Sequence, residues 1–483
     1  MNPSSLTLLI DLYELTMAYG YWKLGMIDRQ AVFTLFFRNP PFQGNFAIVA
    51  GLQSAIDFIK NFKFDPSDIH YLQALQTHNG APLFEKKFIN YLQNFTFACD
   101  VDGVEEGTLI FPYEPLIRVQ GPIIQAQLLE SALLNIINFQ TLIATKASRI
   151  CMAAEGDEVI EFGLRRAQGV DGAFSGTRAA FIGGCHATSN VLAGKHFGIP
   201  VQGTHAHSWV MAFENEKEAF TAYARVMPNH CTFVLDTYDT MQGIKKAIEI
   251  AKNQKGLKMM GVRIDSGDLA HLSIHIRKLL DNAGYRDTQI IASNELDEMI
   301  IHNLKNQGAK IDVWGVGTAL ITGKGQAALD GVYKLSAIQD ANNRWRYKLK
   351  TSEQFMKTTN PGILQVRRFF DTQGMATCDM IYDIEMKHAK HVDLINSIDP
   401  SKKKQVQSNA NHKDLLVPIF RSGKQVYEPP TLLKIQTYAQ LQLNRFFTST
   451  HHFLNPQPYF IGLEKTLYDL KMLLIQSIRS IER

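Results

Sequence analysis

The middle of the chain alternates short apolar runs, rich in β-branched residues, with amphipathic segments of helical length. This alternation limits the possible folds more than any other feature of the sequence. Because strand–helix–strand units pair their strands in parallel with right-handed crossovers, the pattern predicts an α/β fold with a parallel sheet. The predicted strands are Val159–Phe162, Ile199–Gln202, Thr232–Leu235, Met259–Ile264, Gln289–Ala292 and Ile311–Val316.

Helices are predicted between these strands wherever apolar residues recur three or four positions apart. One series runs from Asp239 to Lys252, and a second begins after Asp268 and ends at Gly284. A third begins after Asn294, which we expect to be its N-cap, and ends at Gly308. Glycine suits the C-terminal ends of these two helices, because the residue that follows a helix often adopts a positive φ.

Polar and reactive residues follow the end of every predicted strand. In a (β/α) barrel the loops after all strands converge on one mouth, whereas in an open sheet only the loops near its switch point converge. The sequence therefore favours a barrel with its active site at that mouth. The segments concerned are residues 163–166, 203–208, 236–239, 265–268, 293–295 and 317–318.

The two ends of the chain lack this alternation. Ala31–Arg38 is predicted to be a strand, and Asp102–Gln120 and Lys334–Phe370 are rich in strand signals. Leu463–Ile481 is predicted to be an amphipathic helix that covers a surface. We expect residues 1–118 and 334–483 to form one α+β domain from both ends of the chain, with the barrel in residues 119–333.

Composition excludes several classes of protein. The chain has 483 residues, of which 45% are apolar and 20% charged, as expected of a soluble protein with two or three domains. A net charge of +4 with both signs interspersed argues against a nucleic-acid-binding surface but allows a local basic pocket for phosphates. No long apolar run predicts a membrane span, and no signal peptide is apparent. Five cysteines without a CxxC spacing disfavour disulfides and zinc, and favour the cytoplasm.

His207 is the strongest candidate for a reactive group, because it follows a predicted strand and a Gly203-Thr204 turn. A neutral imidazole is a good nucleophile toward phosphorus when a partner fixes its other ring nitrogen. Asp236, at the end of the next predicted strand, can be that partner, and a helix N-cap is an equally good interpretation of this residue. His205 is a weaker candidate for chemistry.

Arg263 and Asp265 alternate along one predicted strand, so both side chains are expected to point toward the barrel interior. A buried arginine is costly unless it is paired, whereas at the mouth a guanidinium can bind a carboxylate or phosphate through two hydrogen bonds. Asp265, followed by the small residues Ser266 and Gly267, suits a ribose diol. The alternative is a structural salt bridge, with Asp268 as a helix cap.

Gly315, Gly317 and Thr318 end the last predicted strand. Thr318 is expected to open a helix whose N–H groups would bind a phosphate. Arg165 and Arg166 add positive charge to the same mouth, although one of them can simply pair with a carboxylate. The sequence contains no P-loop, HExxH or GxSxG motif.

These segments, taken together and in order, resemble those of the nicotinate phosphoribosyltransferase family. Each is modest evidence alone, but as a set at these spacings they are very specific. The resemblance extends from about residue 11 to residue 370. It covers Asp11–Tyr13, Glu161–Gly169, Ser189–Gly194, Gly203–His207, Leu235–Tyr238, Gly261–Asp268, Gly315–Thr318 and Lys357–Gly362.

The resemblance implies a type II phosphoribosyltransferase fold, with an irregular, TIM-like α/β barrel and a second domain made from both chain ends. It implies the conversion of nicotinate and 5-phosphoribosyl 1-diphosphate to nicotinate mononucleotide and diphosphate, the first step of NAD salvage. The reaction would be driven by ATP hydrolysis, with Mg²⁺ on the phosphates. A homodimer with shared active sites is also implied.

The resemblance further assigns roles to matching positions. His207 would be transiently phosphorylated, and Asp236 would orient it. Tyr13 of a neighbouring subunit would stack on the nicotinate ring opposite Phe162. Thr204 and Arg263 would lie at the nicotinate, and Asp265 and Arg165 at the ribose and substrate. The 5-phosphate would be bound by Gly315, Gly317 and Thr318. No residue is assigned as a metal ligand.

Two alternatives stay open at this point. A nicotinamide-specific relative would be expected to carry an acidic side chain near Thr188 and Ser189, where this chain offers only hydroxyls. A non-catalytic ligand sensor would be expected to have lost His207 or Asp236, and the sequence retains both.

Overall fold

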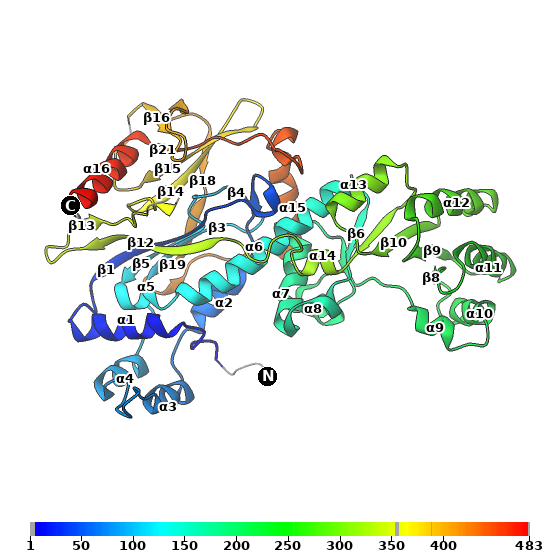
Figure 1. Cartoon of the computed structure of the whole chain (residues 1–483), viewed down its shortest axis with the longest axis horizontal. Helices are drawn as coiled ribbons and strands as arrows, with labels where there is room; N and C mark the ends of the chain where they lie inside the picture. The colour runs from blue at the N-terminus through cyan, green and yellow to red at the C-terminus, as the bar shows by residue number, and fades with distance from the viewer. Residues whose placement is uncertain (1–4, 255, 353–356, 388, 482–483) are drawn as a thin grey trace. The chain divides into compact units, whose positions relative to one another are not determined.

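The computed structural model describes residues 5–254, 256–352, 357–387 and 389–481 of the chain, coloured by position in Figure 1. The chain forms two compact units. The first is built from both ends of the chain, up to Thr141 and from Ala328 onward, and the second is Leu142–Ala327.

An antiparallel sheet of seven strands unites both chain ends within the first unit. Strand β1 (Gln30–Phe37) pairs on one side with β12 (Gly331–Gln339) and on the other with β5 (Ile117–Pro122). Nearly every residue of β1 is buried, as expected of a central strand with cover on both faces. The order is β13-β12-β1-β5-β3-β19-β20, where β13 is Trp345–Tyr347, β3 is Asp100–Val104, β19 is Leu416–Arg421 and β20 is Lys424–Gln425.

The second sheet of this unit lies wholly in the C-terminal part of the chain. Its order is β17-β16-β21-β15-β14-β18, from Lys403–Gln407, His391–Ile395, Ile461–Glu464, Ala376–Asp383, Leu364–Phe370 and His412–Asp414. Helix α16 (Lys465–Ile481) packs on β16 and β21. The predicted covering helix is therefore present, but Leu463 belongs to β21 rather than to the helix. The other helices that begin in this unit are α1 (Leu12–Lys23), α2 (Leu52–Lys60), α3 (Pro66–Ala74), α4 (Lys86–Gln93), α5 (Ile123–Gln127), α6 (Glu130–Ala153) and α15 (Leu432–Leu443).

One stretch, Ile123–Ala153, is long and apolar enough by composition alone to cross a membrane. It comprises α5 and α6, and 67% of its most apolar window is buried inside the protein. Burial of this kind is typical of a core helix, and the apolar composition of the stretch is explained by that burial.

The second unit contains a parallel sheet of six strands, in the order β7-β6-β11-β10-β9-β8. All five pairings are parallel, and helices connect the strands, which confirms the predicted mixed α/β fold. The strands are β6 (Glu158–Glu161), β7 (Ala187–Thr188), β8 (Cys231–Val234), β9 (Met259–Ile264), β10 (Gln289–Asn294) and β11 (Val313–Val316). The helices are α7 (Gly169–Ile182), α8 (Val191–Phe197), α9 (His207–Met211), α10 (Glu216–Val226), α11 (Thr240–Asn253), α12 (Leu269–Asn282), α13 (Glu298–Asn306) and α14 (Thr318–Ile321).

The strand order of this sheet returns on itself, because the last strand, β11, pairs with the first, β6. Within the described part of the chain, no strand pairs with the other edge of β8. The predicted strand Ile199–Gln202 is wrong in extent: only Val201 forms a bridge, to Thr188 of β7. Pro200 has no N–H to donate to a longer ladder.

The helix caps differ from the predictions in two places. Asp297, and not Asn294, caps α13, and accepts from the backbone N–H groups of Met299 and Ile300. Asn294 instead ends β10 with a φ of 136°. Asp239 caps α11 through Gln242 N–H, so the interpretation of Asp236 as that cap is wrong. The predicted glycine ends are confirmed, with φ of 90° at Gly284 and 79° at Gly308.

A buried carboxyl group in the first unit makes the stability of the protein depend on pH. Glu14 of α1 is fully buried and accepts hydrogen bonds from Asp11 N–H and from the backbone and hydroxyl of Ser131. Burial, more than the nearby charge of Glu130, raises the pKa of Glu14 to about 7. A raised carboxyl pKa contributes stability that is complete below the pKa of the unfolded chain and is lost as the pH rises through the folded pKa.

Replacement of Glu14 by glutamine should therefore raise the stability of the folded protein, relative to wild type, more at pH 8 than at pH 5. The amide keeps an acceptor for Ser131 and Asp11 but does not ionise. Thermal unfolding of both proteins at both pH values measures this. The Tm of the variant minus the Tm of the wild type should be roughly 2–4 °C larger at pH 8 than at pH 5. The exposed Glu428→Gln is the matched control, and equal differences for the two variants would contradict the account.

Candidate active site

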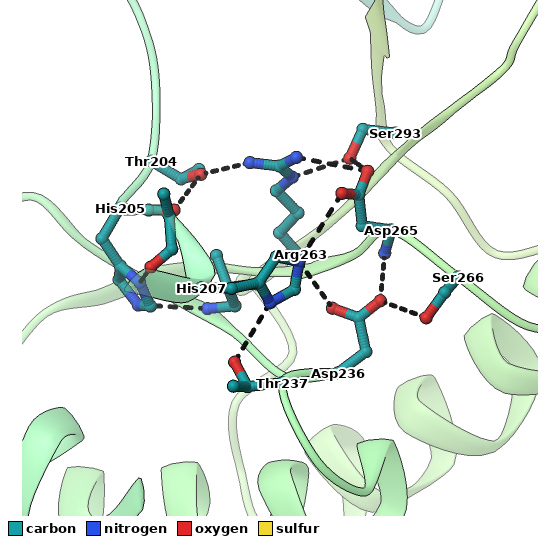
Figure 2. Close-up of polar contacts among 11 residues, drawn as sticks. Thr204, His205, His207, Asp236, Thr237, Arg263, Asp265, Ser266 and Ser293 are labelled. Carbon is teal, nitrogen blue, oxygen red and sulfur yellow. Dashed lines mark hydrogen bonds and ion pairs between the residues drawn. The ribbon is translucent and has the colours of Figure 1, made fainter. Parts of the chain in front are cut away.

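The carboxyl ends of β8, β9 and β10, together with the segment from Thr204 to His207 at the start of α9, form a hydrogen-bonded polar cluster. Figure 2 shows its members, which all belong to the second unit. Parallel strands place their carboxyl ends at one edge of a sheet, so the clustering follows from the topology. The labelled members are Thr204, His205, His207, Asp236, Thr237, Arg263, Asp265, Ser266 and Ser293.

Arg263, near the end of β9, has a guanidinium that is held from three sides. Its Nε donates to Ser293 Oγ at 2.7 Å and its Nη1 donates to Thr204 Oγ1 at 3.0 Å. Its Nη2 lies 3.2 Å from Asp265 Oδ1, and its central carbon lies 5.8 Å from the centre of the Phe162 ring. Only 13% of the side chain is exposed. The group is therefore an oriented cation beside an aromatic face, as recognition of a planar anion requires.

Asp265 is the carboxylate of this cluster with the greatest access to solvent. Its Oδ1 accepts from Ser293 Oγ at 2.6 Å, so Ser293 links Asp265 to Arg263. Although partial burial opposes ionisation, the Ser293 hydrogen bond and the Arg263 charge together lower the pKa of Asp265 below its usual value. Asp265 is therefore an anion at neutral pH and can accept hydrogen bonds from a ligand.

His207 is the first residue of α9 and is partly open to solvent. Its Nδ1 lies 3.1 Å from Thr237 Oγ1. Its Nε2 lies 3.6 Å from Asp265 Oδ2 and 4.0 Å from Asp236 Oδ1. Two carboxylates on the Nε2 side favour the tautomer that carries its proton there, which leaves the Nδ1 lone pair facing the Thr237 hydroxyl.

Asp236 joins the loops after β8 and β9. Its Oδ2 accepts from Asp265 N–H at 2.8 Å and from Ser266 Oγ at 2.6 Å. Its Oδ1 is buried and has no hydrogen-bond partner among the described residues. Asp236 thus has one oxygen engaged in holding the loops and one available to a cation or a protonated group.

His205 is buried, and its contacts are different from those of His207. Its Nδ1 lies 3.2 Å from Ala206 O, and its Nε2 accepts from Val234 N–H at 3.2 Å. Burial, more than the charges of Arg263 and His207, lowers the pKa of His205 to about 4. The ring is therefore neutral, and backbone groups occupy both of its nitrogens.

Phe162 lies directly after β6, with its ring against Gly315 of β11. A side chain at Gly315 would place its Cβ 2.5 Å from the ring, so glycine is required there. The residue before Phe162 is a buried carboxyl, Glu161, which accepts from Thr188 Oγ1 at 2.6 Å and from Thr177 Oγ1 at 3.0 Å. Burial raises the pKa of Glu161 despite these hydrogen bonds. Sequence reasoning did not identify this network, which fixes the strand end that carries Phe162.

The other predicted site residues lie outside the hydrogen-bonded cluster. Thr318 begins α14, as predicted, and its hydroxyl donates to Glu295 at 3.3 Å. Gly317 precedes it, with φ −110° and ψ −97°. Arg165 is exposed in the short 3₁₀ helix Leu164–Arg166. Tyr13 belongs to the first unit, on α1, where 46% of it is exposed.

A cavity of about 640 Å³ runs along the sheet of the second unit and reaches Phe162 and Thr204. Its other lining residues include Ile160, Met259 and Ile291 of β6, β9 and β10. Polar residues at or just before the amino ends of these strands line it as well, among them Glu158, Lys258, Arg286 and Gln289, so the lining mixes polar and apolar groups. His207, Asp236 and Asp265 lie outside this lining.

The described residues contain no cluster of three or more histidine, cysteine, aspartate or glutamate side chains that could hold a metal ion. This absence is compatible with Mg²⁺, which commonly uses one or two carboxylates together with the phosphates of a substrate. Asp236 and Asp265 are such a pair, since Asp236 Oδ1 has no hydrogen-bond partner and Asp265 is partly exposed.

Thr237 and Ser293 are contact residues that sequence reasoning did not assign a role. Both follow predicted strands, at positions where the other reactive residues lie, and this is the signal by which they could have been found. A hydroxyl residue at a strand end is also common in turns and helix caps. Only the contacts seen in the structure distinguish a residue of the site from such a structural residue.

Family models cover most of the chain in three consecutive parts. The nicotinate phosphoribosyltransferase N-terminal domain matches residues 8–138, the nicotinate phosphoribosyltransferase family matches residues 158–368, and the corresponding C-terminal domain matches residues 364–471. The C-terminal match extends to residue 471, well beyond residue 370, where the resemblance seen in the sequence ends.

Relatives resemble the chain over nearly its full length. The nicotinate phosphoribosyltransferase of Bacillus subtilis is 43% identical over 99% of this chain and 97% of its own. The human nicotinate phosphoribosyltransferase is 30% identical over 96% of this chain and 95% of its own. A crystal structure of the human enzyme superimposes with a TM-score of 0.83, at 29% identity, over 97% of this chain and 100% of that one. This chain therefore belongs to the nicotinate phosphoribosyltransferase family.

Proposed function

We propose that this protein transfers the 5-phosphoribosyl group of 5-phosphoribosyl 1-diphosphate to nicotinate, forming nicotinate mononucleotide and diphosphate. The observation that carries this proposal is the fixed guanidinium of Arg263 beside the Phe162 ring. A cation for a carboxylate and an aromatic face for a pyridine ring are the two groups that bind nicotinate. The names of the full-length relatives support the same substrate.

Arg263 and Thr204 are the proposed ligands of the nicotinate carboxylate. The ring would stack on Phe162, with Tyr13 of a neighbouring subunit on its other face, which makes the proposed enzyme a homodimer with shared sites. Exposure of Tyr13 supports this assignment, because a tyrosine with nearly half its surface free is available to a second subunit.

The sugar phosphate is assigned to the same edge of the sheet. Asp265 would accept from the ribose hydroxyls, and the exposed Arg165 would add positive charge. Gly317 and Thr318 would hold the 5-phosphate at the start of α14. Gly315, also assigned to the phosphate, has in addition the steric role of admitting the Phe162 ring.

In the proposed glycosyl step the ring nitrogen of nicotinate bonds to the anomeric carbon as the bond to diphosphate breaks. The transition state is oxocarbenium-like, so the side chains position the reactants and balance charge. Mg²⁺ bound to the phosphates of the substrate would neutralise the leaving diphosphate. Arg263 holds the base by its carboxylate, so that the ring nitrogen points away from the guanidinium.

ATP is the proposed second substrate, with His207 as the phosphoryl acceptor. The Nδ1 lone pair of His207 would attack the γ-phosphorus, ADP would leave, and water would later release inorganic phosphate. The proton on Nε2 would stay between Asp236 and Asp265, which would stabilise the positive ring during attack. Thr237, which lies 3.1 Å from Nδ1, would have to release that nitrogen first.

The nicotinamide-specific alternative is tested by comparing the two bases. The carboxyl group beside Thr188 is that of Glu161, which is buried and already accepts from Thr188 Oγ1, Thr177 Oγ1 and Gly163 N–H, so an amide would have to displace one of these donors. We expect kcat/KM for nicotinate to exceed that for nicotinamide by at least about a hundredfold, measured as mononucleotide formed. Preference for nicotinamide would contradict the assignment of the base, and absence of any mononucleotide would favour the ligand-sensing alternative.

The fold proposed for the second unit is the irregular, TIM-like barrel of type II phosphoribosyltransferases. Pairing of the last strand with the first supports it. We also propose that the enzyme works in the cytoplasm. The two compact units divide after Thr141 and before Ala328, whereas the bounds near residues 118 and 333 expected from the sequence would fall inside β5 and β12. The cysteines support the compartment, because none of the five, at 99, 151, 185, 231 and 378, forms a disulfide.

A further inference from the structure

His205 links the loop of His207 to a strand edge through two backbone hydrogen bonds. Its Nδ1, 3.2 Å from the carbonyl oxygen of Ala206, donates, because a carbonyl can only accept. Its Nε2, 3.2 Å from Val234 N–H, accepts. The two contacts together specify one neutral tautomer, with the proton on Nδ1 (Figure 2).

Val234 presents this N–H on the edge of β8 that pairs with no strand among the described residues. The next residue, Leu235, donates to Arg263 O of the neighbouring strand β9. Successive N–H groups of a strand point to opposite sides, so Val234 N–H points away from β9. Val234 is fully buried, and a buried N–H without an acceptor is costly. The His205 ring thus supplies the hydrogen bond that an adjacent strand would otherwise supply.

Aromatic neighbours hold the ring in this place. Tyr223 of α10 meets it edge to face, with ring centres 4.6 Å apart, and Phe220 lies 6.2 Å away. With both nitrogens engaged and the ring packed, His205 cannot serve as a second phosphoryl acceptor. Its low pKa agrees with a ring that stays neutral throughout the reaction.

We propose that His205 is a positioning residue for the phosphoryl acceptor, which ties the loop carrying His207 to the edge of β8. Two of the three residues that face the His207 ring, Asp236 and Thr237, follow β8 almost directly, and the third, Asp265, follows β9. A tether between the loop and β8 therefore sets the distance between the acceptor and its two partners after β8. This inference rests on the proposed role of His207 as acceptor.

Two substitutions at His205 separate the hydrogen bonds from the packing. His205→Phe keeps an aromatic ring against Tyr223 and removes both hydrogen bonds. His205→Gln loses the ring, but its amide oxygen can reach the position of Nε2 and accept from Val234. We expect His205→Phe to slow phosphorylation of His207 by ATP about tenfold or more, and His205→Gln to slow it by less than about threefold.

Amide hydrogen exchange gives a second readout at the tether itself. The peptide that contains Val234 should exchange faster in His205→Phe than in His205→Gln or the wild type. His196→Phe is the matched control, because His196 also packs on an aromatic ring, with Phe174 5.0 Å away, and lies outside the site. It should change neither the phosphorylation rate nor the exchange. If His205→Phe does not fold, His205→Leu takes its place beside His205→Gln.

The failure of this inference can be told from the failure of the proposed function. Phosphorylation of His207 at the wild-type rate in His205→Phe, or equal rates in the Phe and Gln variants, would overturn the tether alone. Absence of phosphate from His207 in the wild-type protein would overturn the acceptor role, and with it the tether.

Discussion

Replacing Arg263 by methionine is expected to lower kcat/KM for nicotinate by about a hundredfold to a thousandfold. Arg263 is the one arginine among the labelled residues of the site, and its Nε and Nη1 already have fixed acceptors in Ser293 and Thr204. Methionine has a similar length but no charge, so the carboxylate of the base would lose its partner. Asp265 would in addition lose the neighbour that favours its ionisation.

Steady-state kinetics with each substrate varied in turn checks this expectation. The KM for nicotinate should rise much more than the KM for 5-phosphoribosyl 1-diphosphate. Arg263→Lys should give an intermediate loss, because an ammonium keeps the charge but not the planar fork. Arg225→Met, at an exposed position of α10, is the matched control. A loss in Arg263→Met that is equal for both substrates would contradict a specific contact with the base.

Replacing His207 by asparagine is expected to reduce ATP hydrolysis at least about a thousandfold, because the phosphoryl acceptor is removed. Some transfer of the phosphoribosyl group should remain without ATP, since Arg263 and Phe162 do not depend on the imidazole for their contacts. The variant should therefore lose the stimulation by ATP while it retains a basal rate.

The measurement is the ratio of ADP formed to nicotinate mononucleotide formed, with and without each substrate. Wild-type enzyme should hydrolyse ATP together with transfer, and His207→Asn should transfer without hydrolysis. His271→Asn, an exposed histidine on α12, is the control for the substitution itself. ATP hydrolysis at the wild-type rate in His207→Asn would exclude the imidazole as acceptor.

Much of the second unit could be predicted from the sequence because its segments are strongly periodic. The bounds of β9, Met259–Ile264, agree with the prediction, and α11 and α12 begin after the aspartates from which they were predicted. The parallel pairing follows from the alternation of strands and helices. The meeting of Arg263 and Asp265 follows from their alternation along one strand.

Features that depend on tertiary contacts could not be predicted in this way. Asn294 and Asp297 both have cap-forming side chains three residues apart, and only the path of the chain after β10 decides between them. Ile199–Gln202 has the composition of a strand, but its pairing depends on a neighbour that the sequence does not reveal. The bridge of Ser293 between Arg263 and Asp265 requires the register of β9 against β10.

His205 illustrates the same limit at the scale of one side chain. In the sequence it is a second titratable residue beside a reactive one, and the weaker candidate for chemistry of the two. The structure places its ring in a buried environment with both nitrogens on backbone groups. Its role therefore depends on the edge of β8 that no described strand covers, and no local sequence pattern reveals that edge.

Centrally, His207 is proposed to accept a phosphoryl group from ATP, and this step is coupled to transfer of the phosphoribosyl group to nicotinate in the same site. Wild-type enzyme incubated with ATP labelled at the γ-phosphate, followed by peptide mapping under alkaline conditions, tests it most directly. The account predicts an acid-labile label on the peptide that contains His207. Nicotinate and 5-phosphoribosyl 1-diphosphate should then release it as inorganic phosphate while nicotinate mononucleotide forms. A label that is stable to acid, lies on another peptide, or persists while mononucleotide forms would contradict the account.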